Sequence, residues 1–126
     1  MMHLNEISGQ IVDAAMKVHT ALGPGLLESA YEACLKYELE KRGRIVKSQL
    51  TLPVNYDGLF LDAGYRIDLL VDEEVIVELN AVSELAPIHH AQLVSYLKLS
   101  GKRLGLLINF NVHRLKDGIK RLVNQI

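Results

Sequence analysis

Hydrophobic residues in the N-terminal part of this chain recur with the spacing of two amphipathic helices. In the first helix they lie three or four positions apart, at Ile7, Ile11, Ala14, Ala15, Val18 and Leu22. Asn5 is placed to cap this helix, and Gly23-Pro24-Gly25 ends it. A second helix is predicted from about Leu26 to Arg42, with Glu32, Lys36 and Glu40 facing solvent. Its apolar stripe is Leu27, Ala30, Tyr31, Cys34, Leu35 and Leu39.

The middle of the chain changes to the two-residue alternation of β-strands. Residues 46–56 alternate apolar and polar side chains, and Pro53 among them indicates an edge strand or a bulge. Asp57-Gly58 predicts a tight turn into residues 59–61, and residues 62–64 predict another turn. A central hairpin, a helix, a strand and a closing helix then follow, at 66–80, 87–99, 104–110 and 113–123. This order predicts one α/β or α+β domain over residues 1–126, with a mixed β-sheet flanked by helices.

The central hairpin carries acids among apolar side chains. One face of its two arms is apolar, with Ile67, Leu69 and Val71 opposite Val75, Val77 and Leu79. The other face mixes Asp68 and Glu78 with Leu70 and Ile76, so we expect another element to cover it. Covered carboxylates are unfavourable unless a cation, hydrogen bonds or a proton compensates their charge.

The loop of this hairpin decides whether the two acids are neighbours. A three-residue loop, 72–74, pairs Val71 with Val75 and places Asp68 beside Glu78 on one face. A two-residue loop would pair Asp68 with Val77 and turn one carboxylate away. We predict the three-residue loop, because it also stacks the apolar residues of the two arms.

Composition narrows the classes of function. Basic and acidic residues nearly balance, 14 against 15, so any binding to nucleic acid must use a local patch. Cys34 is the only cysteine, which excludes an intramolecular disulfide and indicates a reducing compartment. We find no signal-peptide pattern and no apolar run of membrane-spanning length, so we expect a cytoplasmic protein without a membrane segment.

Three residues in the predicted helices are candidates for a site that includes the two acids. Glu28 borders the apolar stripe of the second helix, where it is either a first-turn glutamate favoured by the helix dipole or a functional acid. Gln92 and Tyr96 lie four residues apart and therefore share one face of the third helix. Taken alone, they would be a surface amide and a core aromatic residue.

The order of these residues resembles the motifs of the PD-(D/E)XK nuclease superfamily, particularly its RecB-type branch. The matching pieces are a helical acid, Arg66-Ile67-Asp68, Glu78-Leu79-Asn80 and the Q-x-x-x-Y pair. Gly25, Glu28 and Tyr31 also match the G-x-x-E-x-x-Y signature of a small bacterial and archaeal family within the superfamily. The resemblance extends from about Ile7 to Val123 and implies a restriction-endonuclease-like core.

This resemblance implies a role for each motif residue. Asp68 and Glu78 would bind Mg²⁺ or Mn²⁺, with Glu28 and the Leu79 carbonyl group as further ligands. Gln92 and Tyr96 would line the site and position the DNA backbone. The metal would stabilise charge on the scissile phosphate and activate a water molecule.

Asn80 departs from the family pattern, which has lysine at that position. Asparagine is shorter than lysine and uncharged, so it cannot replace an ammonium group beside the attacking water. Arg66 lies on the same face as Asp68 and either supplies the missing cation or pairs with an acid. The protein is therefore either a natural pseudo-nuclease or a variant whose active-site lysine has been removed.

Two functions agree with these patterns. The first is a metal-dependent nuclease-fold protein that acts on DNA, with catalysis impaired at Asn80. The second is a non-catalytic module that binds nucleic acid or protein. Basic residues form either a patch for the DNA backbone or an ordinary charged surface: Lys41, Arg42, Arg44, Lys47 and those of the last helix. The oligomeric state, a homodimer included, stays open.

Overall fold

The structure, a computed structural model, describes residues 2–124. Its centre is a five-stranded mixed sheet in the order β1-β4-β5-β6-β7. These strands are β1 (Val46–Thr51), β4 (Arg66–Val71), β5 (Val75–Asn80), β6 (Leu104–Asn109) and β7 (Ile119–Val123). β5 and β6 pair in parallel, and the other neighbours pair antiparallel. The predicted α/β fold with a mixed sheet is confirmed.

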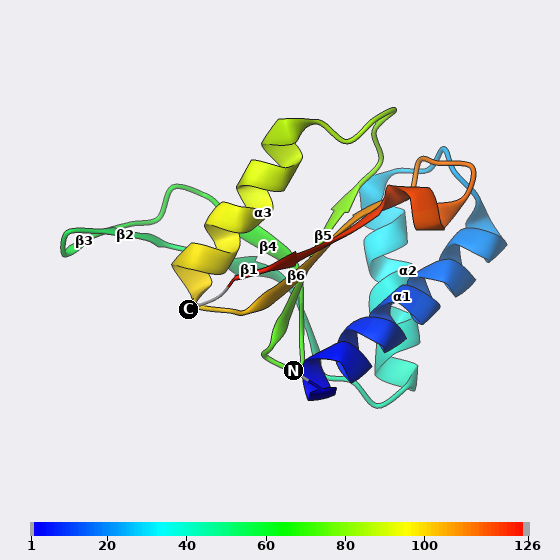
Figure 1. Ribbon diagram of the computed structural model, residues 1–126, viewed down its shortest axis with the longest axis horizontal. Helices are drawn as coiled ribbons and strands as arrows, with labels where there is room; N and C mark the ends of the chain where they lie inside the picture. The colour runs from blue at the N-terminus through cyan, green and yellow to red at the C-terminus, as the bar shows by residue number, and fades with distance from the viewer. Residues whose placement is uncertain (1, 125–126) are drawn as a thin grey trace.

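Helices cover both faces of this sheet (Figure 1). α1 (Met2–Leu22) and α2 (Glu28–Lys41) pack on one face, and α3 (Pro87–Ser100) packs on the other. The predicted apolar stripes are buried at Ile7, Ile11, Ala14, Ala15 and Val18 in α1 and at Tyr31, Leu35 and Leu39 in α2. Leu22 and Leu27 were expected in the stripes but are exposed, because they flank the turn between the two helices.

Two predictions near the ends of the chain are wrong. Asn5 does not cap α1, which already includes Met2; its Oδ1 instead accepts a hydrogen bond from Arg121 (2.6 Å). The predicted closing helix over 113–123 is a short 3₁₀ turn, η1 (Leu115–Gly118), followed by β7. Pairing with β7 satisfies the backbone groups along the outer edge of the buried strand β6, and this outweighs the helical spacing of the apolar residues.

A second sheet forms an arm that projects from the body (Figure 1). It consists of β2 (Val54–Tyr56) paired antiparallel with β3 (Leu59–Leu61). The strand expected over residues 46–56 is interrupted around Pro53, so that β1 stays in the main sheet and β2 belongs to the arm. The predicted turn is confirmed, since Asp57 and Gly58 both have positive φ, 49° and 84°, as a type I′ turn requires.

The central hairpin, β4 and β5, has the predicted three-residue loop. Val71 pairs with Val75, and Leu69 pairs with Val77. α3 covers Leu70 and Ile76, as expected for a face that mixes apolar residues with acids. Ile67 differs from the prediction, because it packs with the cluster under α3 instead of with Leu69. The change of face occurs beside Gln49 of β1, whose backbone has a positive φ of 51°.

Candidate functional site

Asp68 and Glu78 are locked together where β4 and β5 separate. Past the Leu69–Val77 pair, hydrogen bonds from backbone to side chain connect the two strands. The Asp68 N–H donates to Glu78 Oε2 (2.8 Å), and the Leu79 N–H donates to Asp68 Oδ2 (2.8 Å). Each carboxylate therefore binds the backbone of the opposite strand, and the prediction that the two acids are neighbours is confirmed.

Both acids are held in an environment that disfavours their charge. Only 8% of Glu78 is exposed. Burial, followed by the charge of the Asp68 carboxylate, raises the pKa of Glu78 to about 8. Burial also raises the pKa of Asp68, although hydrogen bonds from the Leu79 N–H and the Gln49 amide oppose the shift. The charges that act on Glu78 come from Asp68, Glu32 and Glu28, so they are all negative.

Glu28 lies at the edge of this site, because the turn between α1 and α2 places the start of α2 there. Gly25 adopts a φ of 100° in that turn, a conformation that favours glycine. The buried Tyr31 hydroxyl donates to the Gly23 carbonyl (2.5 Å) and accepts from the Leu26 N–H (3.1 Å). These bonds fix the start of α2, where Glu28 is exposed yet contributes to the raised pKa of Glu78. Of the three residues of the G-x-x-E-x-x-Y signature, Gly25 and Tyr31 thus shape the turn. Glu28 is the one that faces the acids.

Two further residues belong to this group and were not anticipated. Glu32 was assigned to the solvent side of α2, but it is half-buried one turn after Glu28. The Gln49 amide donates to both Glu32 Oε1 (2.7 Å) and Asp68 Oδ1 (3.3 Å), and so links α2 to β4. Burial raises the pKa of Glu32, and the charges of Asp68 and Glu28 add to the shift. The i, i+4 spacing of Glu28 and Glu32 was the available signal, whereas nothing in the sequence marks Gln49.

α3 supplies the opposite wall. Gln92 Nε2 donates to the Tyr96 hydroxyl (3.0 Å), as the four-residue spacing predicts. Burial, followed by the charge of Glu78, raises the pKa of Tyr96. The hydroxyl group is therefore affected by the negative charge of the acids. Tyr65 packs edge-on against the Tyr96 ring, with 6.1 Å between ring centroids. Tyr96 therefore lies near enough to Glu78 for that acid's charge to raise its pKa, and Gln92 is hydrogen-bonded to Tyr96.

Asn80 ends β5, and strand alternation places it on the same face as Glu78. Its Nδ2 is buried and has no hydrogen-bond partner among residues 2–124. The adjacent Asn109 of β6 binds both the Val82 N–H (3.1 Å) and the Val82 carbonyl (2.9 Å), and so holds the chain that leaves β5. Arg66 points elsewhere, because its guanidinium contacts Asp62 (3.8 Å) and the Tyr65 carbonyl (3.1 Å).

The family model described as the PD-(D/E)XK nuclease superfamily matches residues 5–122. The chain belongs to this superfamily. Searches of curated proteins and of solved structures gave no significant match. A PD-(D/E)XK nuclease domain has a mixed sheet flanked by helices, and this chain has that architecture.

PD-(D/E)XK nucleases generally use divalent metal ions. Within residues 2–124, no three His, Cys, Asp or Glu side chains are grouped closely enough to hold a metal ion. Mg²⁺, however, is usually bound by one or two carboxylates together with water and substrate phosphates. Asp68 and Glu78 supply two neighbouring carboxyl groups that no cationic side chain contacts among residues 2–124, which is the donor chemistry that such an ion requires.

Part of the basic surface considered for DNA binding is occupied by ion pairs. Four of its residues, on α2 and β1 or between them, contact an acid: Lys41 with Glu38, Arg42 with Asp13, Arg44 with Asp72, and Lys47 with Glu73. Around α2 and β1 this pairing favours an ordinary charged surface over a patch for the DNA backbone. In the final segment Arg114 contacts Asp117, whereas Lys116, Lys120 and Arg121 form no ion pair among residues 2–124. Across the described part of the chain, no helix combines the length and the hydropathy needed to cross a membrane.

Proposed function

We propose that this protein has the active site of a metal-dependent nuclease for DNA and that Asn80 impairs its catalysis. Within the superfamily we place it in the G-x-x-E-x-x-Y group of the RecB-type branch. One observation carries the proposal: Asp68 and Glu78 are interlocked, buried and surrounded by acids, and no cationic side chain contacts them among residues 2–124. A nuclease site that lacks its lysine should have this electrostatic character.

Each residue of the site has a role in this proposal. Asp68 and Glu78 would hold Mg²⁺ or Mn²⁺, with the Leu79 carbonyl group and Glu28 as further ligands. When bound, the ion would stabilise charge on the scissile phosphate and activate water. Gln92 and Tyr96 would orient the DNA backbone through the amide and hydroxyl groups that they already couple. Gln49 and Glu32 would keep Asp68 in position.

The missing lysine accounts for the expected loss of rate. Negative charge builds on the phosphate as water attacks, and a preplaced cation would lower that barrier. Removal of one such stabilising group typically lowers a rate by about 10²–10³. Asn80 offers an amide without charge, and Arg66 is engaged by Asp62, so neither supplies the cation.

The decisive experiment restores the charge. We expect Asn80→Lys to cleave DNA in the presence of Mg²⁺ or Mn²⁺ at least 10²-fold faster than the wild type. Asn5→Lys is the matched control, because it adds the same charge at an exposed position on α1, which packs on the sheet face opposite α3. The double variant Asn80→Lys/Asp68→Ala should be inactive. Cleavage by Asn5→Lys as well, or by none of the proteins on single- and double-stranded DNA, would contradict the proposal.

A non-catalytic binding module is the second candidate, and Asn80 itself favours it. Calorimetric titration with MnCl₂ separates the two. A retained metal site should give a saturable heat signal of either sign, and Asp68→Asn, which keeps the size of the side chain, should lose that signal. A wild-type protein that binds no Mn²⁺ would leave the binding module as the better account.

A further inference from the structure

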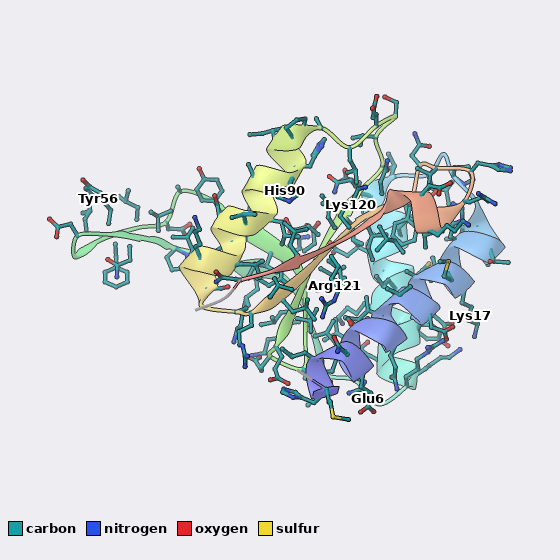
Figure 2. The ribbon with its side chains drawn as sticks, in the orientation of Figure 1. Glu6, Lys17, Tyr56, His90, Lys120 and Arg121 are labelled. Atoms are coloured by element: carbon teal, nitrogen blue, oxygen red, sulfur yellow. The ribbon has the colours of Figure 1, made fainter. Side chains whose placement is uncertain are left out.

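We propose that the β2–β3 arm of one copy packs into the groove between the arm and α3 of a second copy, so that the protein forms a two-fold symmetric dimer. The arm exposes apolar side chains from both of its strands: Tyr56, Leu59, Phe60 and Leu61 are 46–72% exposed. Figure 2 shows Tyr56 on the projecting arm, far from His90 on α3. An isolated two-stranded hairpin is at best marginally stable in water, so burial against a partner would stabilise this arm.

The groove at the base of the arm has matching chemistry. It has a volume of about 470 Å³ and runs along α3, with Val54 and Tyr65 as its opposite wall. Ile88 and Leu99 mark its ends and are 70% and 38% exposed. These two residues lie about 16 Å apart along a helix. The arm from Leu52 to its tip at Asp57 has about the same length when extended, so the lengths of the arm and the groove match.

The exposed area agrees with a stable dimer. In the register of the arm, Tyr56, Leu59 and Leu61 share one face, and Phe60 lies on the other. Aromatic side chains carry about 150–250 Å² of surface each, so the first face and the groove together expose on the order of 600 Å². Standard interfaces bury about 600–1,000 Å² on each partner. Because arm and groove belong to the same chain, two copies related by a two-fold axis bury both arms at once and leave no unpaired patch.

Charge favours a second copy over a nucleic acid. The arm, residues 52–65, contains Asp57 and Asp62 and no lysine or arginine. α3 contains no acid, and it carries His89, His90 and Lys98. The arm is therefore electrostatically suited to α3 of another copy, while its acids would repel the phosphates of DNA.

The dimer would also reach the candidate site. Gln92 and Tyr96 line the groove as well as the wall of the site. An arm from the second copy would therefore lie beside these two side chains. The arm and DNA would therefore compete for this wall of the site. Sedimentation measures the interface without nuclease activity, so the two proposals are tested separately.

Sedimentation of the full chain tests the interface. We expect the wild type to approach twice its 14.1 kDa monomer mass with rising concentration. Tyr56→Ser/Phe60→Ser in the arm and Ile88→Glu in the groove should each weaken association at least tenfold. Tyr37→Ser, which removes a 63% exposed aromatic residue from α2, is the matched control and should sediment like the wild type.

Mixing the two variants provides a sharper test. The Ile88→Glu protein has an intact arm and the Tyr56→Ser/Phe60→Ser protein has an intact groove, so the mixture should form more dimer than either alone. A wild type that stays monomeric from micromolar to submillimolar concentration would overturn the proposal, as would a mixture with no gain. If the monomeric wild type binds oligothymidylate and the arm variant does not, the arm is a nucleic-acid surface instead.

Discussion

The raised pKa of Glu78 makes a definite prediction about stability and pH. Folding shifts this pKa from the ordinary value of 4.5 to about 8, so the folded protein retains a proton that the unfolded chain releases. The stabilisation is complete below pH 4.5 and is lost as the pH rises towards 8. One unit of pKa shift corresponds to about 1.4 kcal/mol, so the free energy of unfolding should fall by up to about 4 kcal/mol between pH 5 and pH 8.

Glu78→Gln isolates this contribution. Glutamine has the shape of protonated glutamate and keeps an oxygen that can accept the Asp68 N–H. At pH 5 the variant should match the wild type within about 1 kcal/mol, whereas at pH 8.5 it should be more stable by about 2–4 kcal/mol. Asp68 and Glu32 titrate in both proteins, so their similar shifts largely cancel in the difference.

The assay is urea unfolding across this pH range in the presence of EDTA, with Glu84→Gln as control. Glu84 is exposed, so the same chemical change there should leave the pH dependence of the wild type intact. Parallel pH profiles for the wild type and Glu78→Gln would refute the reasoning. So would a Glu78→Gln protein that is less stable than the wild type at pH 8.5. Saturating Mn²⁺ should reduce the difference at high pH, because a bound cation compensates the charge.

Two substitutions test how the site is held in place. Tyr31→Phe removes both hydrogen bonds of the buried hydroxyl and should lower the free energy of unfolding by about 1–3 kcal/mol, whereas Tyr37→Phe on the exposed face of α2 should change it little. Gly118→Ala would place a Cβ 2.3 Å from the Asn109 carbonyl oxygen and should destabilise by about 2–3 kcal/mol, whereas Gly9→Ala, with open space around it in α1, should stabilise by about 0.5–1 kcal/mol. Urea unfolding measures all four, and equal effects within either pair would contradict these contacts.

Local sequence patterns predicted most of the helices and strands, because the spacing of apolar residues and the turn residues largely determine them. The two periods of apolar residues identified three helices and the central hairpin, and Asp57-Gly58 identified the turn of the arm. The final strand was missed because Ile119 and Leu122 lie three residues apart, a spacing that agrees with a helix. That segment is a strand because it pairs with β6, and such a contact is not visible in a window of one-dimensional sequence.

The contacts of the candidate site also fall into those that the sequence predicts and those that it does not. The neighbouring positions of Asp68 and Glu78 follow from the loop length, and the bond between Gln92 and Tyr96 follows from helix geometry. The contact of Glu32 with Gln49 was not predictable, since it depends on how α2 packs over β1 and on the positive φ of Gln49. The partner of Arg66 likewise depends on the path of the turn before β4.

The interlocked acids also have a structural role in the central hairpin. Both carboxylates accept backbone hydrogen bonds that close the end of the central hairpin. Asparagine and glutamine could accept the same bonds without charge. The pair is nevertheless ionisable, buried and close to Glu28 and Glu32, an arrangement that lowers stability near neutral pH. Local instability of this kind is typical of functional sites, because a ligand relieves it; a cation that binds Asp68 and Glu78 would do so here.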